Sequence, residues 1–454
     1  MIKINAAKKF REHFSETSIK SVYETKILGT RAIGLDRVDA HNFASKLAAE
    51  TTLISKKVLA STYRFTKYKE KLISKGAGKS PRQLSIPTIR DRLTLKILCD
   101  YLFTVFPKSK PHLPQELIGD LRNAIDSNKY SYFIKIDLKD FYPSINHKLL
   151  LSKLYKRVRI APFRNLINSA LENPTVPETN TKSTAANSQG VAQGLSISNV
   201  LAEIFMMDID EKIGGLAPIC VRFVDDIIIL TNAEPVAVCK DVCEILRKAK
   251  LNPHPLDALG SKTQVGQVSN GLDFLGYSLR PKTVSVRRSS LTNFESSLVS
   301  VFTEYKHRFR NAKDVAEKDS ALARFRWALN LKLTGCIYKN QRFGWVFYYS
   351  QINDLSVLRR IDNTVSLLCK RFDVTVPPNP KRALKAFYES KRTDKESHWY
   401  IPNYDCITVA KMRKFLTEIG YKVGGFPDIE VGFIFHRLVR RATRSLEKDV
   451  ASFS

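Results

Sequence analysis

The 454-residue chain lacks any apolar run of about 18–20 residues, the length that a membrane-spanning helix needs. Residues 1–10 also lack the apolar region of a signal peptide. Cysteine is scarce: the seven cysteines are an odd number and mostly stand in apolar surroundings. Cys239 and Cys243 are four residues apart, but no His or second cysteine pair completes a zinc set. We therefore expect a cytoplasmic protein without membrane association, with reduced and mostly buried thiols.

Acidic residues are few relative to basic ones. The chain has 44 Asp and Glu against 74 Lys and Arg, which gives a formal net charge of +30 at pH 7. An excess of this size predicts a polyanionic partner, whose binding weakens steeply as salt rises. A hydrophobic content of 43% and an aromatic content of 10% are typical of an ordered globular protein with two or three domains.

Two adjacent aspartates, Asp225 and Asp226, stand between two short apolar stretches that predict a β-hairpin. Like charges repel and strands disfavour Asp, so such a pair persists most easily around a doubly positive ion. A further apolar segment, residues 132–136, leads into Asp137, which we expect to end a strand. Three aspartates on neighbouring strands can hold two Mg²⁺ about 3.5–4 Å apart, as polymerases do for phosphoryl transfer. The alternative is an acidic, solvated turn.

Periodicity and capping residues predict the remaining elements in outline. A short strand is expected at 83–87, with a helix starting near Thr88 or Arg90, and Asn146 is expected to cap a helix. Helices are predicted at about 18–72, 195–213 and 234–250 and over most of the chain from 285 onward, with a polar loop at 173–188 and a linker at 377–380.

The order of several motifs resembles the fingers and palm of reverse transcriptases. Residues 136–145 resemble the first palm motif, 190–198 the Gln-Gly segment and 222–226 the aromatic-X-Asp-Asp box. The resemblance runs from about residue 34 to 277 and is strongest to the bacterial group II intron-like and retron-like branch, above all to antiphage defence-associated enzymes. It implies an α+β, right-hand polymerase fold, in which fingers and palm (an antiparallel sheet with helices) precede a helical thumb and a C-terminal helical region.

On this resemblance the chain divides into five parts. They are an N-terminal helical extension (1–75), fingers (76–136), a palm (137–284) with a fingers segment inserted at about 150–190, a helical thumb (285–376) and a basic helical C-terminal subdomain (377–454).

The resemblance assigns the catalytic residues. Asp137, Asp225 and Asp226 would bind two Mg²⁺, with Mn²⁺ as an alternative, and Asp226 is the less strictly required member of its pair in the family. Lys262 would act on the leaving pyrophosphate, electrostatically or as a general acid, although a surface lysine is an equal alternative. Asp140 is either a supporting carboxylate or a helix-start acid, and we favour the latter.

The resemblance also assigns nucleotide contacts. Arg82 and Arg92 would clamp the triphosphate, because Arg suits bidentate phosphate geometry, though one of them could pair with Asp91 instead. Gln193 would hydrogen-bond near the nucleotide, and Gly194 would let the backbone approach it closely.

Tyr142 lies five residues after Asp137, where reverse transcriptases place an aromatic gate against the ribose 2′-hydroxyl. A packed core aromatic is the alternative. Two departures from the family are visible: Phe223 stands where Tyr is commoner, and Asn199 follows Ser198 where the family usually has Pro. A primer-grip hairpin is expected at Phe274, Leu275, Gly276 and Tyr277, with the glycine at the turn.

The implied activity is that of an RNA-directed DNA polymerase, a nucleotidyltransferase that adds dNTPs on an RNA template to make DNA. The patterns of an intron endonuclease, a ribonuclease H and a retron are not evident, which favours antiphage defence with a dedicated noncoding RNA. The alternatives are a mobile-element enzyme (retron or group II intron maturase), an RNA-binding splicing cofactor with an idle site, and an RNA-templated RNA polymerase. The intact aspartates argue against the idle site, and Tyr142 argues against the RNA polymerase. Self-association or a partner protein stays open.

Overall fold

A computed structural model of the chain describes residues 5–28, 30, 32–74, 80–179, 185–256, 260–374, 380–392 and 400–451. The chain divides into two compact units, Met1–His112 with Tyr132–Gly266, and Leu113–Ser131 with Gln267–Ser454. The five predicted parts stay a prediction; their boundaries at 75–76 and 376–377 and the linker residues 377–379 lie outside the described ranges.

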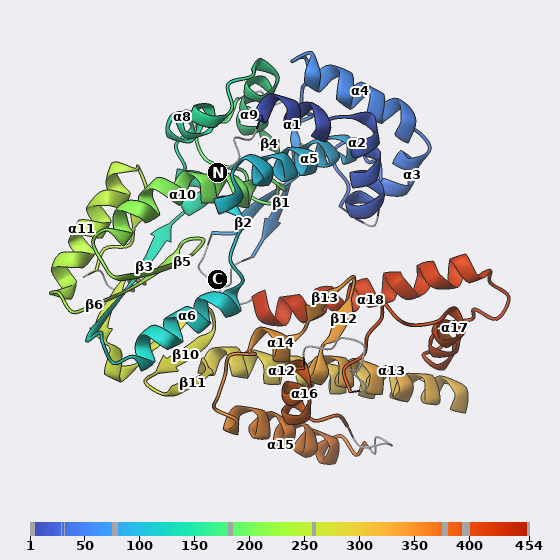
Figure 1. Cartoon of the computed structure of the whole chain (residues 1–454). Helices are drawn as coiled ribbons and strands as arrows, with labels where there is room; N and C mark the ends of the chain where they lie inside the picture. The colour runs from blue at the N-terminus through green and yellow to red at the C-terminus, as the bar shows by residue number, and fades with distance from the viewer. Residues whose placement is uncertain are drawn as a thin grey trace. The chain divides into compact units, whose positions relative to one another are not determined.

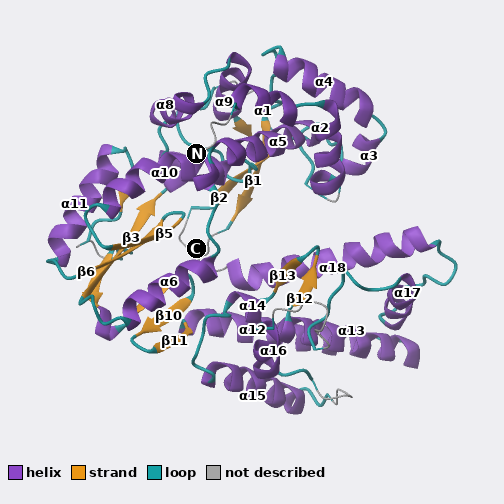
Figure 2. Cartoon of the chain, in the orientation of Figure 1, coloured by secondary structure: helices purple, strands orange, loops and turns teal. Residues whose placement is uncertain are grey.

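The first unit is mixed helix and strand (Figures 1 and 2). Its helices are α1 (Ala6–His13), α2 (Glu16–Val22), the π-helix η1 (Tyr23–Ile27), α3 (Ala40–Ala44), α4 (Leu47–Leu59), α5 (Ile89–Val105), the 3₁₀-helix η2 (Pro107–Ser109), α7 (Phe141–Ser144), α8 (His147–Arg157), α9 (Ala161–Glu172), α10 (Ser198–Gly214) and α11 (Pro235–Lys248). Its strands are β1 (Tyr68–Ile73), β2 (Arg82–Ile86), β3 (Tyr132–Lys139), β4 (Thr175–Val176), β5 (Ile219–Phe223), β6 (Asp226–Thr231), β7 (Asn252–Pro253) and β8 (Gln264–Gln267).

The second unit is mainly helical, as predicted for the chain from residue 285 onward. Its helices are α6 (Pro114–Asp126), the 3₁₀-helix η3 (Val268–Asn270), α12 (Arg288–Arg310), α13 (Val315–Thr334), α14 (Trp345–Tyr348), α15 (Ser356–Arg371), α16 (Ala383–Ser390), α17 (Val409–Glu418) and α18 (Asp428–Ala451). Its strands are β9 (Leu272–Phe274), β10 (Tyr277–Arg280), β11 (Thr283–Val286), β12 (Cys336–Tyr338) and β13 (Gln341–Phe343). None of the helices in the described ranges has the length and apolar character that a membrane crossing needs.

The central sheet of the first unit positions the candidate site. Its strand order is β5-β6-β3-β7, with β8 also paired to β3, and the β5–β6 and β6–β3 pairs are antiparallel. Residues 227–230 of β6 are fully buried, as expected for a continuous apolar strand covered on both faces. Helices α10 and α11 pack against this sheet (Figure 1). The predicted α+β class with antiparallel sheets and helices is confirmed.

Two predicted elements differ in the structure. The predicted helical stretch 18–72 is wrong over its last residues, because Tyr68–Ile73 forms β1, paired antiparallel with β2 and parallel with β4. Charged residues at 69–71 give this segment no strand-like local signal, so its pairing with β2 decides its conformation. The polar loop at 173–188 contains the short strand β4, and its residues 180–184 lie outside the described ranges.

The helix starts that were predicted from capping residues at Thr88 and Asn146 are confirmed. Thr88 caps α5 by accepting from the Asp91 N–H, and Asn146 caps α8 by accepting from the Leu149 N–H at 3.1 Å. Helix α10 begins at Ser198, three residues later than predicted. The Ser198 hydroxyl donates to the carbonyl of Ala192 at 2.6 Å, which fixes the chain as it enters the helix.

Candidate active site

Three aspartates meet on the central sheet. Asp137 in β3 lies opposite Asp226 at the start of β6, as directly paired residues of two antiparallel strands. Asp225 immediately precedes β6, and its carbonyl accepts a hydrogen bond from the Leu138 N–H at 3.3 Å. The structure thus brings the predicted residues together, although Asp137 lies two residues before the end of β3 rather than at its end.

The turn that presents Asp225 is held by a charged network. Val224 has a φ of 57°, a conformation that β-branched residues rarely adopt. Arg222 donates to the Val224 carbonyl at 3.1 Å and is itself bound by Glu203 at 2.6 Å and Asp210 at 2.8 Å. Both acids lie on α10, so this helix anchors the strained turn. Sequence reasoning missed the network; its one local signal is two acids seven residues apart on the same helix face.

Asp137 is only 6% exposed, and two basic groups share its carboxylate. Lys262 Nζ lies 3.2 Å from Oδ1, and His254 Nε2 lies 3.2 Å from Oδ2. The His254 N–H also donates to the Asp137 carbonyl at 3.0 Å. Lys262 therefore lies within the site, as predicted. His254 was not predicted, because only the pairing of β7 with β3 brings it there.

The other two carboxyl groups carry less compensating charge. Burial raises the pKa of Asp225, and the nearby Asp137 carboxylate adds to this effect. Burial, together with Asp225 and Asp137, raises the pKa of Asp226 from 3.8 to about 6, although Lys135 opposes the shift. Negative charge is thus concentrated at one edge of the sheet.

We expect Asp226→Asn to stabilise the metal-free protein at pH 7.5. Because the folded-state pKa is raised, the contribution of Asp226 to stability is present below about pH 4 and is lost as pH rises through about 6. The amide lacks this cost, so the variant should gain on the order of 2 kcal/mol above pH 6 and nothing near pH 4, after allowance for partial exposure. Urea unfolding with a chelator between pH 4 and 7.5 measures the difference. A variant less stable than the parent at pH 7.5 would contradict this explanation.

The donor set fits hard divalent cations. Within the described ranges, no group of three or more His, Cys, Asp or Glu side chains is arranged as a ready-made metal site. Carboxylate oxygens are nevertheless the ligands that Mg²⁺ and Mn²⁺ prefer. Asp225 and Asp226 have raised pKa values that a nearby cation would lower, and Asp137 already pairs with the Lys262 ammonium group. Their role as metal ligands stays a prediction.

Tyr142 lies in α7, beside the Gln-Gly segment. The Tyr142 carbonyl accepts from the Val191 N–H at 2.9 Å, and its hydroxyl donates to Asn199 Oδ1 at 2.6 Å. Burial, with the negative charges of Asp225 and Glu203, raises the pKa of Tyr142 to about 12. The ring therefore lies near the aspartates, as the resemblance implied.

The Gln-Gly segment is joined to β2 through its backbone. The Ser85 N–H donates to the Gln193 carbonyl at 2.7 Å. Gly194 has a φ of 97°, and a Cβ there would lie 3.1 Å from the Ser85 carbonyl oxygen. The position therefore requires glycine for both conformation and close approach.

The two predicted clamp arginines differ in their environment. Arg82 opens β2 with an exposed side chain, and its positive charge acts on both Asp225 and Tyr142. Arg92 instead donates to Thr30 Oγ1 at 3.0 Å and to the Pro87 carbonyl at 3.1 Å. Arg82 is thus available to a ligand of the site, whereas the Arg92 guanidinium is already engaged in the fold.

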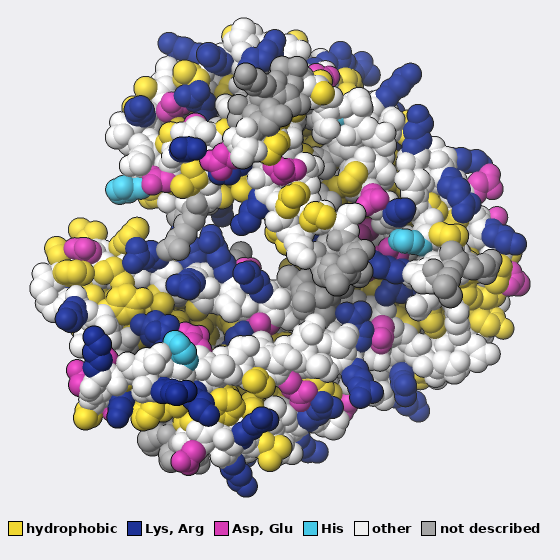
Figure 3. Space-filling view, turned by 180° about the vertical axis from the view of Figure 1, so that it is seen from behind, with side chains coloured by type: hydrophobic (Ala, Val, Ile, Leu, Met, Phe, Trp, Pro, Cys, Tyr) yellow, Lys and Arg dark blue, Asp and Glu magenta, His cyan; other side chains and the backbone are white. Residues whose placement is uncertain are grey.

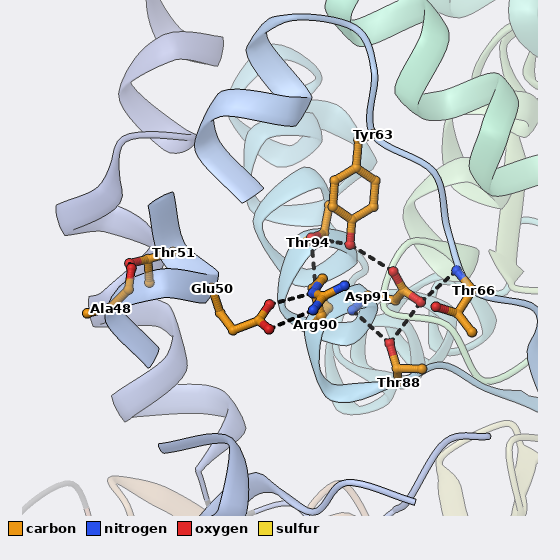
Figure 4. Close-up of polar contacts among 9 residues, drawn as sticks. All are labelled: Ala48, Glu50, Thr51, Tyr63, Thr66, Thr88, Arg90, Asp91 and Thr94. Atoms are coloured by element: carbon orange, nitrogen blue, oxygen red, sulfur yellow. Dashed lines mark hydrogen bonds and ion pairs between the residues drawn. The ribbon is translucent and has the colours of Figure 1, made fainter. Parts of the chain in front are cut away.

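Asp91 is bound by neither clamp arginine. It is 1% exposed and accepts from the Tyr63 hydroxyl at 2.7 Å, the Thr88 hydroxyl at 2.8 Å and the Thr66 N–H at 3.0 Å (Figure 4). Its neighbour Arg90 is paired with Glu50. Asp91 therefore joins the loop after α4 to the start of α5, and its carboxylate is not paired with Arg82 or Arg92.

The predicted primer-grip hairpin lies in the second unit. Leu275 and Gly276 have φ values of 48° and 79° and form the tight turn between β9 and β10. The flanking aromatics, Phe274 and Tyr277, are buried, and the Tyr277 hydroxyl donates to the Tyr348 carbonyl. The hairpin and its glycine turn are as predicted, and its aromatics support the turn from within the core.

Comparisons with known proteins identify the segment that contains these aspartates. Residues 73–279 match the family described as reverse transcriptase (RNA-dependent DNA polymerase). Protein YkfC of Escherichia coli (strain K12) is 21% identical over 334 residues, which cover 60% of this chain and 84% of that protein.

Two solved structures are similar in part. An apo telomerase from Candida tropicalis, truncated from its C-terminal domain, gives a TM-score of 0.36 at 18% identity, over 49% of this chain and 55% of that one. A telomerase from Candida albicans with a fragment of telomeric RNA gives 0.43 at 12% identity, over 90% of this chain and 67% of that one. The family match alone identifies residues 73–279 as a reverse transcriptase domain, and RNA-directed DNA polymerase is the activity of that family.

Proposed function

We propose that the chain reverse-transcribes a dedicated noncoding RNA in antiphage defence, and that the three aspartates of the central sheet carry the chemistry. The observation that supports this most is the register that pairs Asp137 with Asp226 beside Asp225, inside the segment that matches the family. Two divalent cations, Mg²⁺ or in its place Mn²⁺, would supply an activated primer hydroxyl and stabilise charge on the leaving group.

The chain's own basic residues would hold the dNTP. Arg82, exposed and electrostatically coupled to Asp225, is our candidate for the triphosphate contact. Arg92 would support the triphosphate site indirectly, because its guanidinium donates to the Pro87 carbonyl just after β2 and so holds that strand in place. Lys262, whose side chain is 62% exposed, can leave Asp137 to stabilise or protonate the pyrophosphate.

Sugar and primer would be positioned by rigid elements. The Tyr142 ring would exclude a ribose 2′-hydroxyl. Gln193 would hydrogen-bond near the nucleotide, and the backbone at Gly194 would approach it closely. At the primer grip, the 3′ end of the primer would lie against the backbone of Leu275 and Gly276, because the flanking rings of Phe274 and Tyr277 are buried.

A polyanionic partner is supported by an exposed stripe on α18. Phe433, Arg437, Arg441 and Arg444 lie on its exposed face, with the Arg437 guanidinium 5.9 Å from the Phe433 ring centroid. The opposite face is buried. Like charges one turn apart destabilise a helix, and a bound phosphate backbone would relieve that repulsion. Lys and Arg side chains are also spread over the face in Figure 3. RNA is therefore our proposed partner, with DNA as product and dNTPs as substrates.

We expect the triple change Arg437→Gln, Arg441→Gln, Arg444→Gln to make RNA binding less salt-dependent. Losing three phosphate contacts should reduce the slope of log K against log salt by about 2 for single-stranded RNA. Fluorescence anisotropy between 50 and 300 mM salt measures this slope. The matched control is Lys248→Gln, Arg308→Gln, Arg360→Gln, whose cations already pair with carboxylates and should change it less. Equal slopes for both triples would remove α18 from the interface.

The defence role and its RNA are tested by sequencing nucleic acid that co-purifies with the protein and with its Asp225→Ala, Asp226→Ala variant. We expect one RNA species in both samples and complementary DNA only with the parent, because the variant lacks two carboxylates of the site. The same DNA in both samples would refute templated synthesis by this site. An intron or retron RNA would instead identify a mobile-element enzyme.

A further inference from the structure

Tyr142 is held both through its backbone and through the tip of its side chain. Its carbonyl accepts from the Val191 N–H at 2.9 Å, while its hydroxyl donates to Asn199 Oδ1 at 2.6 Å. The Phe141 ring lies alongside, with 5.4 Å between the ring centroids. Rotation of the ring away from its place would break the bond between its hydroxyl and Asn199.

Asn199 is well placed to hold the ring because its own position is rigid. It is the second residue of α10, directly after Ser198, whose hydroxyl is bound to Ala192. Helix α10 also carries Glu203 and Asp210, which grip Arg222 and the turn before Asp225. One helix therefore supports both the turn that presents Asp225 and the tip of the Tyr142 ring. A proline at this position, as the reverse transcriptase resemblance leads one to expect, offers no side-chain acceptor.

The two groups are matched as donor and acceptor, at a position that is open to solvent. The phenol stays protonated at physiological pH, since burial and the Asp225 carboxylate raise the pKa of Tyr142 to about 12. The phenol can therefore always donate, and the Asn199 carbonyl oxygen is a neutral acceptor that adds no charge beside the aspartates.

We propose that Asn199 is a positioning residue for sugar selection: by holding the Tyr142 hydroxyl it keeps the ring where a ribose 2′-hydroxyl would collide with it. The inference rests on the proposed function and deepens it, since it assigns discrimination between dNTP and rNTP to a contact between α7 and α10. A ring released at its tip can rotate away, and the ribonucleotide then enters.

The test compares kcat/KM for one dNTP and its matching rNTP, in primer extension on an RNA template. Asn199→Ala should raise the rNTP-to-dNTP ratio about tenfold, the scale of one lost hydrogen bond, through a higher kcat/KM for the rNTP. Asn199→Asp keeps an acceptor at the same place and should restore most of the discrimination, while its added charge should change kcat/KM for the dNTP and the rNTP alike. Tyr142→Phe removes the donor and should raise the ratio by a similar factor.

Non-additivity separates this role from a merely structural one. If the hydroxyl and the amide act together, the double variant Asn199→Ala, Tyr142→Phe should discriminate no worse than either single variant. Additive effects, or an equal fall for dNTP and rNTP in Asn199→Ala, would overturn the inference and leave the polymerase assignment intact. A parent protein that extends no primer would instead refute the proposed function, and the inference with it.

Discussion

Asp225→Asn is expected to reduce dNTP incorporation by a factor on the order of 10³, without loss of the fold. The amide keeps the size of the side chain but removes a negative charge from the edge where Asp137, Asp225 and Asp226 meet. Loss of a single preorganised electrostatic group in an active site costs about 10²–10³ in rate, and a metal ligand is at the upper end. Single-turnover primer extension on an RNA template measures the change, and Asp137→Asn should behave alike.

Asp140→Asn is the matched control. Asp140 lies three residues after Asp137, but its side chain is exposed and makes no capping bond, and its φ of 49° starts α7. The activity of the Asp140→Asn variant should stay within about twofold of the parent, because surface changes that touch no ligand of a site have small effects. Equal losses at positions 140 and 225 would show that charge near the sheet matters in general, and would refute the specific assignment.

The predictable part of the site consists of residues placed by short-range sequence patterns, namely apolar strands and the turns between them. Asp225 and Asp226 stand at the short turn between two apolar strands, and Asp137 lies near the end of a third, so antiparallel pairing brings them close. The turn at Leu275 and Gly276 is a comparable case only at its glycine, because Gly276 suits a positive φ whereas Leu275, with a φ of 48°, does not.

The contacts that sequence reasoning missed all join distant segments. His254 reaches Asp137 only because β7 pairs with β3, and Arg222 reaches Glu203 only because α10 packs on the sheet. The His254 contact leaves no periodic or motif-like pattern in the chain, and the Arg222 contact leaves only the seven-residue spacing of Glu203 and Asp210 on α10. The helix prediction for Tyr68–Ile73 was wrong for a related reason, because the segment forms a strand through its pairing with β2 and not through a local signal in its own residues.

Removal of the Tyr142 ring should have the second largest effect. Tyr142→Ala is expected to raise the rNTP-to-dNTP ratio of kcat/KM by about 100-fold, because steric rejection of an analogue with one more hydroxyl is worth about that factor. The ring is half-buried, and its hydroxyl is bound to Asn199. Steady-state incorporation opposite one template base, with each sugar in turn, measures the ratio.

The graded series Tyr142→Phe and Tyr142→Ala separates ring from hydroxyl. Phe keeps the bulk and loses only the bond to Asn199, so it should raise the ratio about tenfold, well short of Ala. The ring packs beside Phe141, and Ala leaves a cavity that lowers stability, so thermal unfolding must show both variants folded at the assay temperature. If Ala leaves the sugar preference unchanged in a folded, active enzyme, Tyr142 is a packing residue. Selection of the deoxynucleotide must then come from another side chain of the site.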